Sequence, residues 1–210
     1  MERKNQKGLF IVFEGIDGSG KTTQAMMLSN YLLNKGYRVL QTEEPTRELI
    51  TGFFVKIALR HKDHLPPETY LLLFIADRLN HIENTIRPAL SAGKIVISDR
   101  YHFSTLAYQT AQGIPRERID NFIIALGVDI LQPDITVFVD TPVDVALERL
   151  SDREKGVVDL FERREFLEKV RRNFLSLAEE FNFIRVDGSK DPLTIHKEII
   201  KKIEKRLPPP

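Results

Sequence analysis

The stretch Gly15-Ile16-Asp17-Gly18-Ser19-Gly20-Lys21-Thr22 fits the pattern G-x-x-x-x-G-K-[ST], which is typical of loops that bind the phosphates of a nucleoside triphosphate. The apolar residues 9–13 precede it and predict a strand that is buried on both faces. After the loop, the apolar residues follow helical spacing until Gly36, which predicts the end of a helix. The expected inner face of that helix consists of Ala25, Leu28, Leu32 and Leu33.

The glycines of this loop let the backbone turn tightly and direct its N–H groups at an anion, at the positive end of a helix dipole. The loop predicts an ATP or GTP user. We expect the phosphates of the nucleotide, ATP in the interpretation developed below, to contact Gly15, Ile16, Asp17, Gly18, Ser19, Gly20, Lys21, Thr22 and Thr23. Lys21 should reach the β and γ phosphates, and Thr22 should offer its hydroxyl to a magnesium ion. The alternative is a glycine-rich turn that is followed by an exposed lysine.

The composition limits the classes of function. The 210 residues include 31 basic and 30 acidic side chains, and this balance argues against a nucleic-acid or polybasic membrane-binding protein. The chain has no cysteine, which excludes disulfides and a thiolate nucleophile. The polar residues 1–7 lead directly into the first predicted strand without a hydrophobic targeting segment. We therefore expect a cytoplasmic protein with no nucleic-acid or membrane partner.

Four further strand candidates alternate with helical segments, at residues 37–41, 94–98, 135–140 and 183–186. Such alternation requires crossover connections. We therefore expect an α/β fold of the P-loop NTPase type, a three-layer sandwich with a five-stranded, mostly parallel sheet and helices on both faces. Because no linker or repeat divides the chain, residues 1–210 should form one domain. A helix over about 191–207 should end in a frayed proline tail, 208–210.

Polar residues follow the predicted strands where they end. In open parallel sheets the ligand binds beyond the carboxyl ends of the strands, so these residues are candidates for function. Asp99 follows the third strand, where P-loop enzymes hold a carboxylate near the metal; the alternative is an aspartate that caps the next helix. Arg100 offers a guanidinium fork that suits a second phosphate, whereas the alternative is a solvated surface arginine.

Residues 70–78 are apolar over too many positions for a simple amphipathic helix, which predicts a central helix. Phe74 and Arg78 stand four residues apart and share a face of that helix. Together they can offer a stacking ring and a hydrogen-bonding fork to a planar base. Without this context, a phenylalanine is more often a core residue.

In their order and spacing, these motifs resemble the thymidylate kinase family over nearly the whole chain. The resemblance rests on residues 13–24, on Glu44-Pro45-Thr46, on Phe74 with Arg78, on Asp99-Arg100-Tyr101 followed by Ser104, Thr105 and Tyr108, and on Gln132-Pro133-Asp134. It implies transfer of a phosphoryl group from ATP to dTMP, which supplies the dTTP pathway, with Mg²⁺ as the cofactor. It also implies a homodimer through the helices around residues 70–90 and 100–125.

The resemblance assigns the dTMP site to Phe74, Arg78, Arg100, Thr105, Tyr108 and Arg47. Phe74 would stack on thymine, while Arg78 and Thr105 would read its polar edge. Tyr108 would crowd the position of a ribose 2′-hydroxyl, and Arg100 would bind the acceptor phosphate. Arg47 matches a phosphate-binding arginine of only some relatives, and its role is left open.

Phosphoryl transfer mainly requires alignment and positive charge. The catalytic residues that we expect are Lys21, Asp17, Arg153 and Asp99, and the metal ligands are Thr22 and Asp99. Residues 149–162 resemble the flexible lid of the family, from which Arg153 would supply a cation, ahead of Arg149 and Lys155. The loop has no arginine between its first glycine and its lysine, so the lid must contribute this charge. Alternatively, these residues are the solvated end of an amphipathic helix.

Two other functions stay open. Another nucleoside monophosphate kinase or a deoxynucleoside kinase would use the same phosphate chemistry, although an uncharged nucleoside would leave Arg100 without a phosphate to bind. A nucleotide-dependent switch would turn over slowly without a small acceptor. The chain lacks a convincing Asn-Lys-x-Asp segment for guanine recognition, which disfavours the switch.

Overall fold

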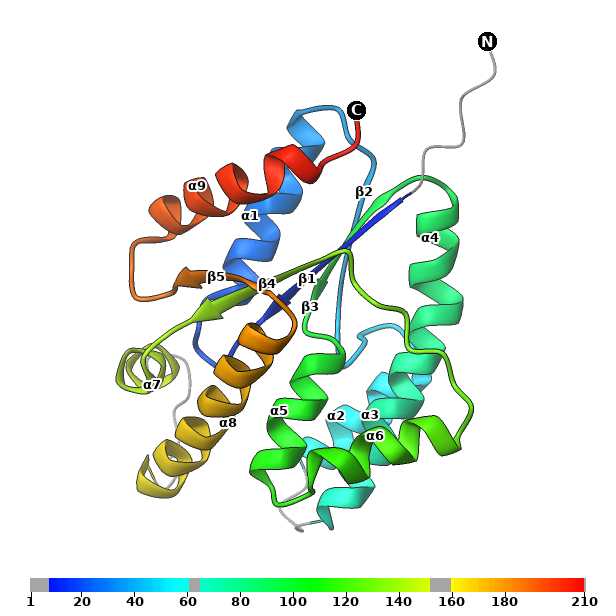
Figure 1. Ribbon diagram of the computed structural model, residues 1–210, viewed down its shortest axis with the longest axis vertical. Helices are drawn as coiled ribbons and strands as arrows, with labels where there is room; N and C mark the ends of the chain where they lie inside the picture. The colour runs from blue at the N-terminus through cyan, green and yellow to red at the C-terminus, as the bar shows by residue number, and fades with distance from the viewer. Residues whose placement is uncertain (1–7, 61–64, 152–159, 210) are drawn as a thin grey trace.

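The computed structural model describes residues 8–60, 65–151 and 160–209. Within these residues, five parallel strands form one sheet in the order β2-β3-β1-β4-β5 (Figure 1). The strands are β1 (Leu9–Glu14), β2 (Val39–Glu43), β3 (Ile95–Asp99), β4 (Ile135–Asp140) and β5 (Ile184–Asp187). All five predicted strands are therefore present; β4 has the predicted bounds, and the other four end one or two residues later than predicted.

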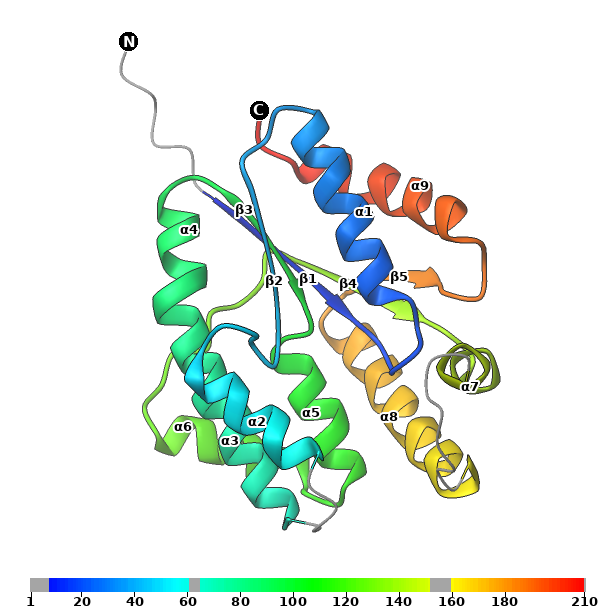
Figure 2. The same cartoon turned by 180° about the vertical axis from the view of Figure 1, so that it is seen from behind.

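The central strand, β1, explains why the sheet has helices on both faces. Its side chains alternate between two cores, because Ile11 and Phe13 pack on one side while Phe10 and Val12 pack on the other. The first face is covered by α1 (Lys21–Asn34) and α9 (Pro192–Ile203), which lie next to each other in Figure 2.

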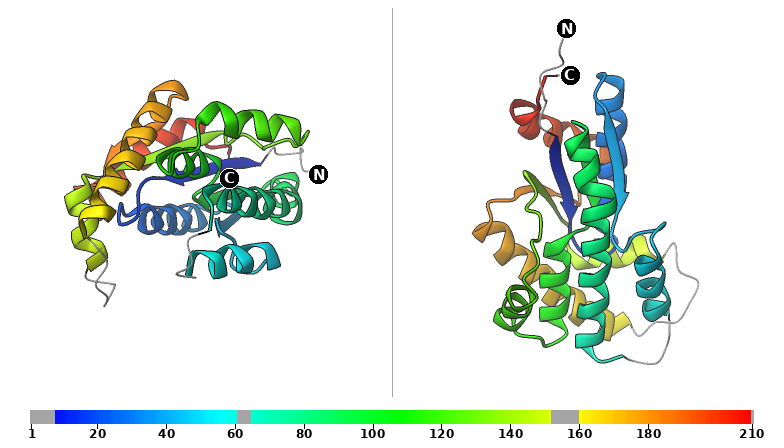
Figure 3. Two further views of the ribbon diagram at one scale, coloured as in Figure 1. Left: turned by 90° about the horizontal axis from the view of Figure 1, so that it is seen from below. Right: turned by 90° about the vertical axis from the view of Figure 1, so that its right-hand side faces the viewer.

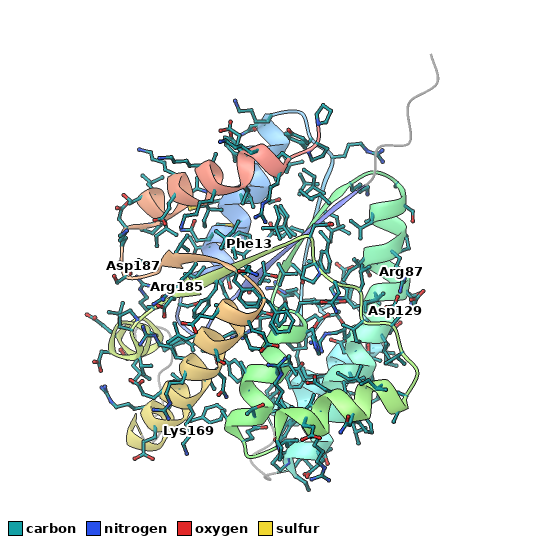
Figure 4. All side chains as sticks on the ribbon, viewed as in Figure 1. Phe13, Arg87, Asp129, Lys169, Arg185 and Asp187 are labelled. Carbon is teal, nitrogen blue, oxygen red and sulfur yellow. The ribbon has the colours of Figure 1, made fainter. Side chains whose placement is uncertain are left out.

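The second face carries the larger helical layer, which Figure 3 shows from below and from the side. The helices of this layer and those packed on it are α2 (Ile50–Arg60), α3 (Pro67–His81), α4 (Arg87–Ser91), α5 (His102–Ala111), α6 (Arg116–Ala125), α7 (Val143–Ser151) and α8 (Leu160–Glu180). A π-helical turn, η1 (Ile82–Ile86), joins α3 to α4 in one long run of helix. Arg87 of this run pairs with Asp129 at 2.9 Å, and the two residues lie side by side in Figure 4.

Two details of the helices differ from the sequence-based expectation or refine it. Leu33 was expected on the inner face of α1 but is 51% exposed, because α1 turns this position away from the sheet. In α3, Ile75 is buried between neighbouring helices whereas Leu72 is 51% exposed, so the helix is central with one open side.

Pro208, which was expected to lie in a frayed tail, is hydrogen-bonded to the rest of the protein. α9 ends at Ile203 and is followed by a 3-10 turn, η2 (Glu204–Arg206). The Tyr37 hydroxyl donates a hydrogen bond of 2.8 Å to the Pro208 carbonyl, while Pro210 lies outside the described residues. Among the helices that the structure describes, none is both long enough and apolar enough to cross a membrane.

Candidate active site

The loop 15–22 joins β1 to α1 at the carboxyl edge of the sheet, as its sequence predicts. Gly20 is the N-cap residue of α1 and has a φ of 92°, a value in the left-handed region that favours glycine. Gly18 has a φ of 77°, and a Cβ atom there would lie 2.3 Å from the carbonyl oxygen of Ala146 in α7. The loop therefore needs glycine both for its backbone angles and for its contact with α7.

The side chain of Lys21 folds back over the loop. Its Nζ donates a hydrogen bond of 3.2 Å to the carbonyl of Ile16, and the residue is only 6% exposed. Burial and the nearby Arg100 lower the pKa of Lys21 to about 8, although the carboxylates of Asp17 and Asp99 act in the opposite direction. The ammonium group thus lies among acidic and basic groups at the start of α1.

Thr22 and Asp99 come together although 77 residues separate them in the chain. The Thr22 hydroxyl donates a hydrogen bond of 2.5 Å to Oδ2 of Asp99. Asp99 is 8% exposed, and no described group donates to its Oδ1. A hydroxyl beside a carboxylate oxygen that has no other partner fits a divalent cation that prefers oxygen ligands.

The described residues contain no cluster of three or more acidic, histidine or cysteine side chains that could hold a metal ion by themselves. Mg²⁺ commonly binds through one or two protein oxygens, and water and substrate phosphates complete its coordination. Thr22 and Asp99 therefore fit a metal that arrives with a nucleotide better than a metal that the protein holds alone.

Asp17, Arg100 and Tyr108 form one hydrogen-bonded group between the loop and α5. Nη2 of Arg100 lies 2.5 Å from Oδ1 of Asp17 and 3.2 Å from the Tyr108 hydroxyl, which itself donates to Asp17 at 3.0 Å. The guanidinium also stacks 5.0 Å from the centre of the Tyr108 ring. Desolvation in the cleft would raise the pKa of Asp17, but the charges of Arg100 and Lys21 lower it to about 2.

Glu14 is a central residue of the site for which the sequence analysis predicted no role. Its fully buried carboxylate accepts hydrogen bonds from the Tyr101 amide (3.0 Å), the Ser104 amide (3.1 Å) and the Ser104 hydroxyl (2.5 Å). Burial raises the pKa of Glu14 to about 7, while its bonds to Ser104 and the charge of Arg100 limit the shift. The signal in the sequence is an acidic residue at the end of an otherwise apolar strand.

A cavity of about 390 Å³ opens beside this group, between α3 and α5. Five of the six side chains predicted to bind dTMP line it, namely Phe74, Arg78, Arg100, Thr105 and Tyr108. Asp17 of the loop lines the same cavity. Aromatic and aliphatic walls with a few charged groups are typical of a site for a planar, polar ligand. Further lining side chains include Pro45, Tyr70, Tyr101, Gln109 and Phe166.

Comparison with known proteins decides the family of this chain. The sequence model of the family described as thymidylate kinase matches residues 13–199, which include the loop, the cavity and α8. The chain belongs to the thymidylate kinase family. This membership confirms the predicted family and the α/β P-loop fold, and it assigns to the chain the ATP-dependent phosphorylation of dTMP. The use of ATP implies a divalent metal ion.

Individual relatives match along nearly their whole length. A "Probable thymidylate kinase" from Pyrococcus horikoshii is 40% identical over 207 residues, which cover 96% of this chain and 98% of the relative. Another, from Thermococcus kodakarensis, is 40% identical over 95% of this chain and 98% of its own length. A "Thymidylate kinase" from Sulfurihydrogenibium sp. is 41% identical over 95% of this chain and 98% of its own length.

Arg47 lies apart from the other residues that the thymidylate kinase resemblance assigned to the dTMP site. It lines a second cavity of about 510 Å³, together with Thr22, Thr23 and Asp99. Its side chain is 73% exposed, and Nη2 lies 2.7 Å from a carboxylate oxygen of Glu43. In this structure Arg47 therefore faces the loop and the strand end of β2 rather than the cavity beside Phe74.

The lid that the sequence predicts for this member of the thymidylate kinase family is described only at its two ends. Arg153 and Lys155 lie outside the described residues, as does most of 149–162. Arg149, in the last turn of α7, donates hydrogen bonds to the carbonyls of Gly18 (3.4 Å), Ser19 (3.3 Å) and Gly188 (3.0 Å). Arg149 is thus the described arginine of this segment that contacts the loop.

Proposed function

We propose that the chain transfers the γ-phosphoryl group of ATP directly to the phosphate of dTMP, without a covalent intermediate on the protein. One observation carries this proposal: Asp17 belongs to the loop 15–22 and also lines the cavity of about 390 Å³. Nucleotides bound at the two places would therefore bring their phosphates together beside Asp17. Direct transfer depends mainly on such alignment.

On the acceptor side, we assign the phosphate of dTMP to Arg100, whose guanidinium is already oriented by Asp17 and Tyr108. Phe74 would stack on the thymine ring, and Arg78 and Thr105 would read its polar edge. This assignment is supported by the shared position of these side chains on one cavity. An aromatic ring and a charged fork within one cavity fit a base that carries a phosphate.

On the donor side, the backbone N–H groups of 15–23 would hold the ATP phosphates, and Lys21 would neutralise charge that develops on the transferred group. Thr22 and Asp99 would hold a divalent cation, proposed to be Mg²⁺, which would supply positive charge beside the phosphates. Arg153 stays our first choice for the lid cation. Arg149 is the alternative, because it already lies beside the loop.

We also propose a homodimer. Exposed apolar side chains support it, because α2 presents Phe53 at 57% and Phe54 at 53% exposure. Leu72 of α3, which packs against α2, is 51% exposed. Light scattering during size-exclusion chromatography would measure the mass; a mass near 24 kDa instead of twice that value would contradict the dimer.

The place of action that we propose is the cytoplasm, where ATP is abundant and where a chain without cysteine has no need of an oxidising compartment. Fractionation of cells that produce the protein would test this. Recovery of the protein in a membrane or an extracytoplasmic fraction would contradict it.

The decisive experiment compares acceptors. Purified protein is incubated with ATP, Mg²⁺ and one of dTMP, dUMP, CMP, AMP, thymidine or no acceptor, and the nucleoside diphosphate and ADP are quantified. We expect dTDP to form much faster than any other diphosphate. Hydrolysis of ATP at the same rate with and without an acceptor would instead favour a nucleotide switch or another P-loop activity. Rapid phosphorylation of CMP or AMP would favour another nucleoside monophosphate kinase.

A further inference from the structure

Beyond the residues that line the acceptor cavity, a buried chain of hydrogen bonds runs behind Arg78. Arg78, Glu44 and His81 are 1%, 6% and 1% exposed. Nε and Nη2 of Arg78 both donate to Oε2 of Glu44, at 3.0 and 2.7 Å. Since both bonds go to the same oxygen, the other carboxylate oxygen of Glu44 is left for a different partner.

That partner is His81, the last residue of α3. Its Nδ1 lies 3.0 Å from Oε1 of Glu44, and its Nε2 lies 2.7 Å from the Thr42 hydroxyl of β2. A carboxylate only accepts hydrogen bonds, so Nδ1 carries the proton and donates to Glu44. In the neutral ring, Nε2 then accepts from Thr42. Four side chains thus form one continuous chain from the edge strand of the sheet to the acceptor cavity.

The arrangement leaves one nitrogen of Arg78 free for a ligand. Among the described residues, no group accepts a hydrogen bond from Nη1 of Arg78. The guanidinium packs 5.2 Å from the centre of the Tyr101 ring, and Arg78 and Tyr101 both line the acceptor cavity. A buried donor without a partner is costly, so an acceptor atom of a ligand in this cavity that paired with Nη1 would remove that cost.

The carboxylate that orients Arg78 is itself held from two sides. The backbone amide of Glu44 donates to the carbonyl of Asp99 at 3.0 Å, which fixes the main chain of Glu44 at the end of β3. His81 supplies the second restraint, on the side chain. Without His81, Oε1 of Glu44 would lose this hydrogen bond, and the carboxylate could rotate with the guanidinium that it binds.

We propose that His81 is a positioning residue for the nucleobase of the acceptor, which acts through Glu44 to fix the plane of the Arg78 guanidinium. This inference rests on the proposed function, because it takes the cavity of about 390 Å³ as the acceptor site. His81 itself does not line that cavity; it lines the second cavity, near Thr42. Its effect on the acceptor is therefore indirect and should be specific to the base.

Two substitutions at this position separate the roles of hydrogen bonding and packing. His81→Leu fills the space but removes both hydrogen bonds, whereas His81→Asn keeps an amide N–H near the position of Nδ1. We expect His81→Leu to raise the KM for dTMP about tenfold, the effect of losing one hydrogen bond to a charged group. The KM for ATP should stay within about twofold, and His81→Asn should restore most of the affinity for dTMP.

A double-mutant cycle tests whether His81 acts through Arg78. Arg78→Lys keeps the charge but removes the fork, so adding His81→Leu to it should cause no further loss of dTMP affinity. Calorimetric titration of each variant with dTMP alone measures this affinity without ATP, and thermal unfolding shows whether each variant is folded. Thr42→Val, which removes the outermost hydrogen bond, should have a smaller effect than His81→Leu.

The outcomes distinguish this inference from the function on which it rests. If the unaltered protein neither binds nor phosphorylates dTMP, the proposed function is wrong and the role of His81 falls with it. If the unaltered protein phosphorylates dTMP but His81→Leu leaves the KM for dTMP unchanged, only the inference is wrong. An equal rise in the KM for dTMP and for ATP in His81→Leu would show that His81 acts on the fold and not through Arg78. The same would follow if the losses of dTMP affinity in His81→Leu and Arg78→Lys added fully in the double variant.

Discussion

The proposed donor side and the proposed acceptor side of this candidate active site are built in different ways. The donor side is the loop 15–22, a continuous stretch whose glycine backbone and helix N-terminus supply the contacts. The acceptor side is a cavity between α3 and α5, formed by side chains that lie far apart in the sequence. The first depends on backbone geometry, and the second depends on side chains that other side chains hold in place.

This difference predicts how each side responds to substitution. Most N–H groups of the loop survive any change of side chain, so the donor side is sensitive mainly at its glycines and at Lys21. The acceptor cavity can lose one contact at a time, and each loss should affect dTMP more than ATP. Kinetic constants measured separately for the two substrates therefore test the comparison directly.

The largest expected effect is on the donor side, at Lys21. Lys21→Ala should lower kcat about 10³-fold, since one preorganised cationic donor to the transferred group is lost. The KM for dTMP should change little. The exposed Lys201 of α9 provides the control, because Lys201→Ala should leave both constants unchanged. A mainly increased KM for dTMP in Lys21→Ala would contradict the separation of the two sides.

Arg100 should give the next largest effect, now confined to the acceptor. Arg100→Ala removes the guanidinium proposed to bind the acceptor phosphate, and kcat/KM for dTMP should fall about 10²-fold. Because Asp17 also loses its partner, thermal unfolding should be measured in parallel. The exposed Arg118 of α6 offers a matched control variant, Arg118→Ala. A larger rise in the KM for ATP than for dTMP would place Arg100 on the donor side instead.

A smaller effect is expected when only a hydroxyl is removed. Tyr108→Phe keeps the ring but deletes the bonds to Asp17 and Arg100, so kcat/KM for dTMP should fall about tenfold. Discrimination against the ribonucleotide TMP should persist, because we attribute it to the ring. The ratio of kcat/KM for dTMP to kcat/KM for TMP, measured in the unaltered protein and in Tyr108→Phe, tests this. Loss of discrimination in Tyr108→Phe would show that the hydroxyl carries it.

The smallest effect is expected in the stability of the fold and concerns Glu14, the last residue of β1. The pKa of Glu14 is raised from 4.5 to about 7, so the folded state binds its proton more tightly than the unfolded state. Ionisation of Glu14 therefore lowers the free energy of unfolding as the pH rises from 4.5 to about 7. Above about pH 7 the whole of this decrease is present.

The variant Glu14→Gln should lack this dependence. Its melting temperature relative to the unaltered protein should increase by about 5–10 °C between about pH 5 and pH 8. Any constant difference that comes from the altered bonds to Ser104 does not affect this slope. Thermal unfolding at several pH values measures it, and a difference that stays constant with pH would contradict the raised pKa.

The sequence predicted the strand, loop and helix of the proposed donor side well, because a local motif encodes them. A strand, a glycine loop and a helix follow one another without interruption, and periodicity alone identified all five strands to within two residues. The pairing of Thr22 with Asp99 was also predictable, since both follow strands whose carboxyl ends meet at one edge. The exposure of Leu33 was missed, because helical spacing alone does not reveal how wide the buried face is.

The acceptor side was only partly predictable. The resemblance identified the side chains, and the cavity brings five of them together, but it could not reveal which groups hold them. The contacts of Glu44 with Arg78 and His81 span more than thirty residues, and no periodicity encodes them. Likewise, the pairing of Arg47 with Glu43 depends on the side-chain conformation of one exposed residue. Arg153 stays a prediction, since it lies outside the described residues.

The end of β3 joins the two sides through a single residue. The side chain of Asp99 binds Thr22 on the donor side, and its carbonyl accepts the Glu44 amide that supports the acceptor side. A change in the path of this strand would therefore alter both proposed substrate sites together. Substitutions around Asp99 are therefore expected to have non-additive effects on activity. In an evolving population, the loss of activity caused by one such substitution would depend on which others are already present.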